Sequence, residues 1–384
     1  MFILKYKTAG MIWGVCLVLS GSVLDDIDEM SEIDKSNMLS FCAKASHHYR
    51  EAARLSDGIS VSFRNPENIV VCGMGGSGIG GDLLKDWARE DASLSIEVNR
   101  EYSLPAYAKE DTLALIVSYS GETEETLGAF LDALRRKCMI FCISSGGSLI
   151  EFAKKLKVPY LQIPAGMPPR AALPYLFIPS LMLLEKMHVV SGVSEQSSEA
   201  ADILENVSKM NSPGVPARDN SCKKVALAVY GTVPVVYGFG VFRGVAQRIK
   251  QQFNENSKIP SKWEYFSELD HNEVVGWEAA GNLGLSFSAI VLRDKSEPDA
   301  VRTRIETTKG LMKSSVSKIV EVWAQGDSKL ARMLSTVCVG DFSSVYLAIL
   351  HGIDPTPVST IDRLKIEIGK QGSRNKIIDE LKEF

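Results

Sequence analysis

Short apolar runs rich in valine and isoleucine alternate with amphipathic stretches through the first half of the chain. The apolar runs lie at residues 68–74, 95–100, 113–120, 139–145 and 158–164. Helical patterns follow or separate them at residues 75–90, 124–137, 148–157 and 170–187. Because strands that alternate with helices form parallel sheets covered on both faces, the pattern predicts a doubly wound α/β domain.

The same alternation returns after a segment rich in serine and proline. Further strands are predicted at residues 225–231, 235–240, 285–294 and 316–325, and further helices at 242–253 and 330–351. We therefore expect two related α/β domains, at residues 24–210 and 224–384, joined by a linker at 211–223. Each has a mainly parallel sheet flanked by helices, and the second includes a C-terminal tail.

Residues 1–23 precede this pattern. Lys5 and Lys7 stand before an apolar stretch at 11–19, which small residues follow, and this arrangement formally resembles a signal peptide. The alternative is an extension upstream of the real start. We favour the extension because everything downstream is typical of a cytoplasmic protein.

The composition narrows the class of protein. The 384 residues carry 43 Lys and Arg against 47 Asp and Glu, a net charge of −4, which disfavours nucleic acid as a partner. No uninterrupted apolar run reaches the roughly 18 residues that span a bilayer, so we expect no membrane partner. The seven cysteines are scattered without a CxxC pair, which predicts buried thiols in a reducing compartment and no metal site.

Two loops carry candidate chemistry. Residues 73–81 (GMGGSGIGG) follow a predicted strand and open a helix, which suits close approach of a phosphate to backbone N–H groups. They also satisfy the GxGxxG dinucleotide pattern, with Glu97 about 20 residues further on. Residues 118–126 (SYSGETEET) place three hydroxyls around a glycine at a second strand-to-helix junction. Hydroxyls and free amides there can hold a phosphate dianion, whereas plain N-capping would need only one hydroxyl.

The two loops are predicted to follow neighbouring parallel strands, the place where such sheets bind ligands. A nicotinamide site would need only the first loop. The second loop therefore shifts the prediction from a dinucleotide to a sugar phosphate.

The ordered motifs resemble one known family. SYSGETEET is similar to the phosphate loop of the sugar isomerase (SIS) domain. The chain as a whole, from about Leu24 to its end, resembles the bifunctional phosphoglucose/phosphomannose isomerases of archaea and some bacteria. The further motifs that carry this resemblance are GMGGSGIGGD, PPRAALPYL, NENSK, ELDHNEVVGW and GIDPTPVSTIDRLK. The resemblance implies two SIS domains, a homodimer, hexose 6-phosphate substrates and no cofactor.

The resemblance also implies which residues bind the substrate. Ser118, Ser120 and Thr123 would hold the sugar phosphate. Gly76 and Ser77 would line the sugar.

Four further residues take catalytic roles by the same resemblance. Glu255 would move a proton between C1 and C2, and Arg170 would stabilise the developing enediolate. His271, supplied by the partner subunit, and Lys365 would open the sugar ring. Lys370 is the alternative ring-opening lysine, and Thr356 or Ser359 would lie near the sugar.

The reaction requires these residue types independently of any family. Aldose–ketose isomerisation removes a proton next to a carbonyl, for which a carboxylate is a suitable base. A nearby cation stabilises the enediolate. Two other functions are alternatives. A sugar-phosphate sensor of the same fold would need no base or ring-opening groups. A nicotinamide-dependent dehydrogenase would need a hydride-transfer site in the place that SYSGETEET occupies.

Overall fold

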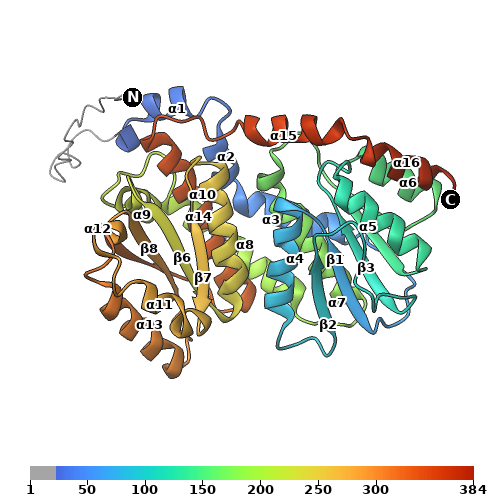
Figure 1. Cartoon of the computed structure of the whole chain (residues 1–384), viewed down its shortest axis with the longest axis horizontal. Helices are drawn as coiled ribbons and strands as arrows, with labels where there is room; N and C mark the ends of the chain where they lie inside the picture. The colour runs from blue at the N-terminus through green and yellow to red at the C-terminus, as the bar shows by residue number, and fades with distance from the viewer. Residues whose placement is uncertain (1–22) are drawn as a thin grey trace, which may run out of the picture.

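The computed structural model describes residues 23–384, so the prediction for residues 1–23 lies, except for Val23, outside the described residues. Two lobes lie side by side (Figure 1). We call the one with strands β1–β5 the first lobe and the one with β6–β9 the second lobe. All strand pairs in both sheets are parallel.

The first lobe is a five-stranded sheet in the order β2-β1-β3-β4-β5. Its strands are β1 (Asn68–Cys72), β2 (Ser95–Asn99), β3 (Thr112–Val117), β4 (Met139–Ser144) and β5 (Tyr160–Gln162). Its crossover helices are α4 (Gly75–Ala88), α5 (Glu124–Arg135) and α6 (Gly147–Lys155), and the 3₁₀ turn η2 (Pro169–Ala172) leads into the buried helix α7 (Leu173–Lys186). The order reverses between β1 and β3, so the loops after these two strands are neighbours at the edge where such sheets bind ligands.

The second lobe repeats this order in a four-stranded sheet, β7-β6-β8-β9. Its strands are β6 (Val233–Phe239), β7 (Lys262–Phe266), β8 (Phe287–Arg293) and β9 (Lys318–Trp323). The helices and 3₁₀ turns here are α9 (Ser221–Val229), η3 (Gly240–Phe242), α10 (Arg243–Glu255), η4 (Glu268–His271), α11 (Glu273–Gly276), α12 (Gly281–Gly284), α13 (Asp299–Met312) and α14 (Lys329–Leu350). The shared strand order confirms the expected pair of related α/β halves.

The strand predicted at 225–231 is wrong, because residues Ser221–Val229 form helix α9. The side chain of Asn220 caps its first turn by accepting from the backbone N–H of Lys223 at 2.9 Å. The buried positions Cys222, Val225, Ala226 and Val229 have helical spacing. The apolar run is therefore one face of a helix that packs against α14.

The remaining helices lie before, between and after the two sheets in the sequence. They are η1 (Val23–Asp25), α1 (Ile27–Ile33), α2 (Met38–Ala43), α3 (Ala45–Ser56), α8 (Val193–Met210), α15 (Ser359–Gly369) and α16 (Ser373–Lys382). Helix α14 is long and apolar enough to cross a membrane, with a mean hydropathy of 1.6 over its best window. However, 89% of that window is buried inside the protein, as in the core helix of an α/β lobe.

Each end of the described chain packs on the lobe that it does not belong to in sequence. At the N-terminal end, the backbone carbonyl of Leu24 accepts a hydrogen bond from Lys223, and Asp25 accepts one from the backbone N–H of Ala217 at 2.7 Å. At the C-terminal end, α16 lies against α5 of the first lobe, where Leu381 is fully buried in that lobe's core. Helix α15 crosses between the lobes (Figure 1).

Helices α4 and α10 pack against each other where the two lobes meet. The carboxylate of Asp86, near the end of α4, accepts a hydrogen bond from the backbone N–H of Gly244, at the start of α10, at 2.6 Å. The start of α4 and the end of α10 both lie beside η2, so the two helices run antiparallel. The ligand-binding edge of the first sheet therefore lies on the same side of the molecule as the C-terminus of α10.

Candidate active site

The hydroxyls of the second predicted loop gather at the start of α5. Ser118 is buried, and its Oγ donates to Thr123 Oγ1 at 3.1 Å and accepts from the backbone N–H of Gly121 at 3.1 Å. Exposed Ser120 accepts from the backbone N–H of Glu122 at 3.2 Å. Thr123 occupies the N-cap position, but its hydroxyl pairs with Ser118 and does not cap the helix. The first-turn N–H groups of α5 therefore point toward the loop, as a phosphate site requires.

The first loop lies against the second. Ser77 Oγ accepts a hydrogen bond from the backbone N–H of Tyr119 at 3.2 Å. This bond joins the start of α4 to residues 118–126, which we call the hydroxyl loop. A Cβ atom at Gly76 would lie 2.9 Å from the carbonyl oxygen of Pro169, so this glycine allows η2 to approach. The glycine-rich stretch therefore brings Arg170, which follows Pro169, close to the start of α4.

Arg170 is nearly fully buried, with 2% of its surface exposed. Its Nε donates to Asn256 Oδ1 at 2.6 Å, and its Nη2 donates to the carbonyl oxygens of Pro355 and Thr356 at 2.7 and 2.9 Å. Its Nη1 lies 3.8 Å from Glu255 Oε2. Burial lowers the pKa of the guanidinium, and the charge of Glu255 opposes that shift. The predicted cation and the predicted base thus face each other across the contact between η2 and α10.

Glu255 is the last residue of α10, and its side chain is 26% exposed, so a ligand can reach it. Lys258 follows it closely and donates to the carbonyl oxygens of both Glu255 and Pro355, the latter at 2.8 Å. Burial and the nearby charge of Arg170 lower the pKa of Lys258 to about 8. Arg170 and Lys258 therefore both donate to the loop that precedes α15, and the Glu255 carboxylate faces Arg170.

The structure does not bring His271 to this site. His271 is exposed at the end of η4, where β7 ends and α10 begins. Glu255 stands at the other end of α10, and thirteen residues at about 1.5 Å rise put roughly 19 Å between the two ends. Within one chain, His271 cannot reach the group around Glu255.

Lys365 lies on α15, whose residues are all exposed. This helix starts just after Thr356, which Arg170 holds. It leads into α16, where Arg374 binds Glu122 of the hydroxyl loop. Lys365 therefore lies on a segment anchored at both parts of the site, and Lys370 lies one residue beyond the same helix.

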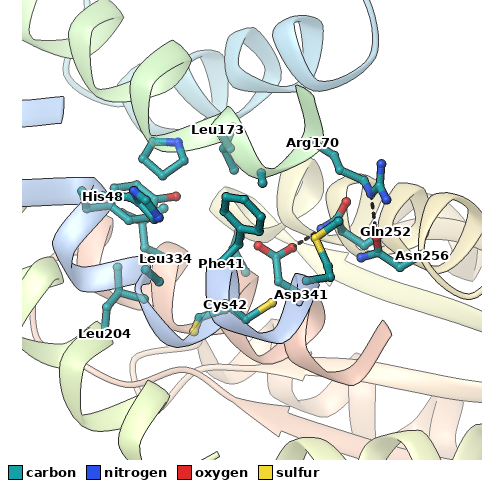
Figure 2. Close-up of a pocket in the computed structure, with 17 residues that line it drawn as sticks. Phe41, Cys42, His48, Arg170, Leu173, Leu204, Gln252, Asn256, Leu334 and Asp341 are labelled. Atoms are coloured by element: carbon teal, nitrogen blue, oxygen red, sulfur yellow. Dashed lines mark hydrogen bonds between the residues drawn. The ribbon is translucent and has the colours of Figure 1, made fainter. Parts of the chain in front are cut away.

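A cavity of about 40 Å³ lies behind Arg170, between α2, α3, α10 and α14 (Figure 2). His48 lies toward one end, and Arg170 and Asn256 toward the other. Sites for small molecules usually enclose about 300 Å³ or more, whereas one water needs about 10–15 Å³. The cavity has room for water and is too small for a hexose phosphate.

Residues with metal-ligand side chains meet elsewhere, on α3. Ligand atoms of His47, His48 and Glu51 lie within 4.8 Å of one another. Tyr175 ties two of them together, because its hydroxyl donates to Glu51 and bonds His48 Nδ1 at 2.9 Å. His48 Nε2, by contrast, is buried without a hydrogen-bond partner among the described residues.

Sequence reasoning missed Asn256 and Lys258 as parts of this site. Both stand in the NENSK motif beside Glu255, but an amide and a lysine in a short motif do not show which neighbour they bind. Their partners, Arg170 and Pro355, are about 90 residues away in either direction, so only the tertiary structure reveals them.

Comparisons with known proteins identify one family. Residues 218–368 match the family model of the bacterial phospho-glucose isomerase C-terminal SIS domain. The chain is 40% identical to a bifunctional phosphoglucose/phosphomannose isomerase of Caldicellulosiruptor bescii, over 81% of this chain and 92% of that protein. It is 36% identical to another of that name from Aquifex aeolicus, over 79% and 91%. Among solved structures, a hypothetical protein from Thermus thermophilus shares the fold, with a TM-score of 0.70 at 13% identity over 90% and 94% of the two chains.

Proposed function

The chain belongs to the family of bifunctional phosphoglucose/phosphomannose isomerases, and from that premise we propose that it interconverts glucose 6-phosphate and mannose 6-phosphate with fructose 6-phosphate. The observation that carries the proposal is the pair of Glu255 and Arg170, 3.8 Å apart and linked through Gly76 and Ser77 to the hydroxyl loop. A phosphate sensor would need the loop alone, so a buried cation facing an accessible carboxylate favours catalysis.

The proposed mechanism follows from that geometry. The carboxylate of Glu255 takes the proton from C2 of the open-chain aldose and returns it to C1, while the proton on O2 moves to O1. In between, the negative charge of the enediolate rests on the oxygens of C1 and C2. Arg170 Nη1 stabilises that charge without leaving its other partners. Phosphate binding at the Ser118 loop orients the sugar for this transfer.

We propose Lys365 as one ring-opening group, supported by the anchoring of α15 at Thr356 and at Glu122. We propose that the protein forms both glucose 6-phosphate and mannose 6-phosphate because the side chain next to C1 and C2 of the substrate is small. Thr356, whose carbonyl already holds Arg170, suits that place better than Ser359, which lies further along on exposed α15. A small side chain leaves the enediol room to turn and be protonated from either face.

We propose that the protein works as a homodimer, with His271 acting in the partner's site. The support is the roughly 19 Å that separates the two ends of α10, together with the aliphatic side chains that α15 exposes: Ile361, Leu364, Ile366 and Ile368. We also propose a cytoplasmic location, for which the free thiols of the six described cysteines are the support.

The phosphate site is tested by Ser118→Ala in an assay that follows fructose 6-phosphate conversion to each aldose phosphate. We expect KM to rise about 10- to 100-fold, because a hydrogen bond to a charged group contributes about 1.5–3 kcal/mol. We expect a smaller change in kcat. Ser180→Ala, at a buried serine of α7, is the matched control and should leave KM unchanged. A KM that is unchanged in Ser118→Ala would contradict the phosphate assignment.

Shared sites are tested by mixing inactive variants. Glu255→Gln and His271→Asn subunits, after exchange, should recover about a quarter of wild-type activity, because half of the dimers are mixed and each has one intact site of two. Glu255→Gln mixed with Arg170→Lys should recover nothing, because both residues belong to one chain's site. Equal recovery in the two mixtures, or none in either, would refute the proposal for His271.

A further inference from the structure

The guanidinium of Arg170 has little freedom left for a substrate. Nε is bound to Asn256, and Nη2 is shared between the carbonyl oxygens of Pro355 and Thr356. Among residues 23–384, the remaining nitrogen, Nη1, faces the Glu255 carboxylate at 3.8 Å, longer than a hydrogen bond. Nη1 is therefore the donor with room to accept a new partner.

Asn256 is the one side chain that accepts a hydrogen bond from this group among the described residues. It is buried, with 1% exposed, directly after Glu255 at the end of α10. Its Oδ1 accepts from Arg170, while its Nδ2 donates to Ser344 Oγ at 2.9 Å, and Ser344 in turn donates to the carbonyl of Asp341 at 2.7 Å. Because the amide nitrogen is held by α14, the amide oxygen must face Arg170.

A second anchor holds the backbone of Arg170. Arg248, on the buried face of α10, donates to the carbonyl oxygen of Arg170 at 2.7 Å. Asp341 binds Arg248 at 3.2 Å and also accepts from Gln252 at 2.8 Å, the contact drawn beside the Arg170–Asn256 bond in Figure 2. With its main chain fixed, the guanidinium is oriented by Asn256 at Nε and by the carbonyl oxygens of Pro355 and Thr356 at Nη2.

We propose that Asn256 is a positioning residue for the isomerisation, which fixes the guanidinium of Arg170 so that Nη1 faces the enediolate oxygens beside Glu255. The proposal rests on the proposed function. Displacing a catalytic group by about 1 Å can cost about 100-fold in rate. The hydroxyl loop lies in the first lobe and touches neither Asn256 nor Ser344 among the described contacts, so the proposal separates catalysis from phosphate binding.

Asn256→Leu tests the proposal because leucine keeps the branched shape of the side chain but has two methyl groups in place of the amide oxygen and nitrogen, and so no acceptor. We expect kcat to fall about 10- to 100-fold while KM stays within about threefold. By calorimetry, the affinity for arabinonate 5-phosphate, whose planar carboxylate mimics the enediolate, should fall by a similar factor. The affinity for glucitol 6-phosphate, which carries the phosphate without that carboxylate, should not change. Asn256→Asp, which keeps the acceptor, should recover most of kcat.

Controls keep folding and positioning apart. Asn220→Leu removes a buried amide that caps α9, far from the site, and should lower the melting temperature without changing kcat. If Asn256→Leu folds poorly, Ser344→Ala takes its place, with a smaller loss of kcat expected because the amide is then free to turn. A wild-type kcat in the variant used, or an Asn256→Asp variant as slow as Asn256→Leu, would overturn the proposal. Absence of isomerase activity in the wild-type protein would instead overturn the proposed function.

Discussion

Glu255→Gln is expected to lower kcat about 10²- to 10⁴-fold for both glucose 6-phosphate and mannose 6-phosphate, the range that a positioned general base contributes. Glutamine keeps the shape of the side chain. The end of α10 should stay in place, because Asn256 still accepts from Arg170 and Lys258 still donates to the backbone carbonyl of residue 255. KM should change little, because the phosphate loop lies on the other lobe. Both activities should fall together, since one base serves both aldoses.

Two measurements test this prediction. One is the assay that follows fructose 6-phosphate conversion to each aldose phosphate, and the other is the exchange of substrate protons with deuterium oxide. Wild-type protein should introduce deuterium at C1 of fructose 6-phosphate, and Glu255→Gln should lose this exchange in proportion to kcat. Glu205→Gln, at an exposed carboxylate of α8 that binds Arg50, is the control and should match wild type. Exchange that survives in Glu255→Gln would assign the base to another residue.

Arg170→Lys should lower kcat by about 10²–10³-fold, as the loss of one preorganised donor to an oxyanion does. Lysine keeps the positive charge but not the planar fork, so it cannot bind Asn256, Pro355 and Thr356 together. Those buried acceptors would then lack a partner, and the melting temperature should fall as well.

Kinetics and thermal unfolding together test this variant. Arg302→Lys, at an arginine half exposed on α13, is the matched control and should change neither quantity. A lower melting temperature with wild-type kcat would show that Arg170 only joins the lobes. Weaker binding of arabinonate 5-phosphate, with unchanged binding of glucitol 6-phosphate, is the expected signature of a catalytic role.

Local sequence carries much of this structure but not its long-range contacts. The buried runs at 68–74 and 113–120 are continuous and end at a loop that contains glycine, so both strands and the loop of Ser118 are predictable. The run at 225–231 looks the same, yet the cap by Asn220 and packing on α14 make it a helix. The domain boundaries remain predictions.

The meeting of Arg170 with Glu255 lies beyond any local pattern, because the two are 85 positions apart in the sequence. The motifs identify each residue only through a family resemblance. Most donors of the guanidinium are bound by Asn256 and by the carbonyls of Pro355 and Thr356. This arrangement follows from the packing of three segments that are distant in the sequence, and no local sequence pattern predicts it.

The exchange of chain ends between the lobes has a consequence for biosynthesis. Leu24 is synthesised before its partner Lys223, which is 199 residues later, and α16 of the first lobe follows the whole second lobe in the sequence. Domains usually fold as they are made, the N-terminal one first. Here the core of the first lobe lacks Leu381, and Glu122 lacks Arg374, until the whole second lobe has been synthesised. The first lobe and its hydroxyl loop are therefore completed after the second lobe, although they come first in the sequence.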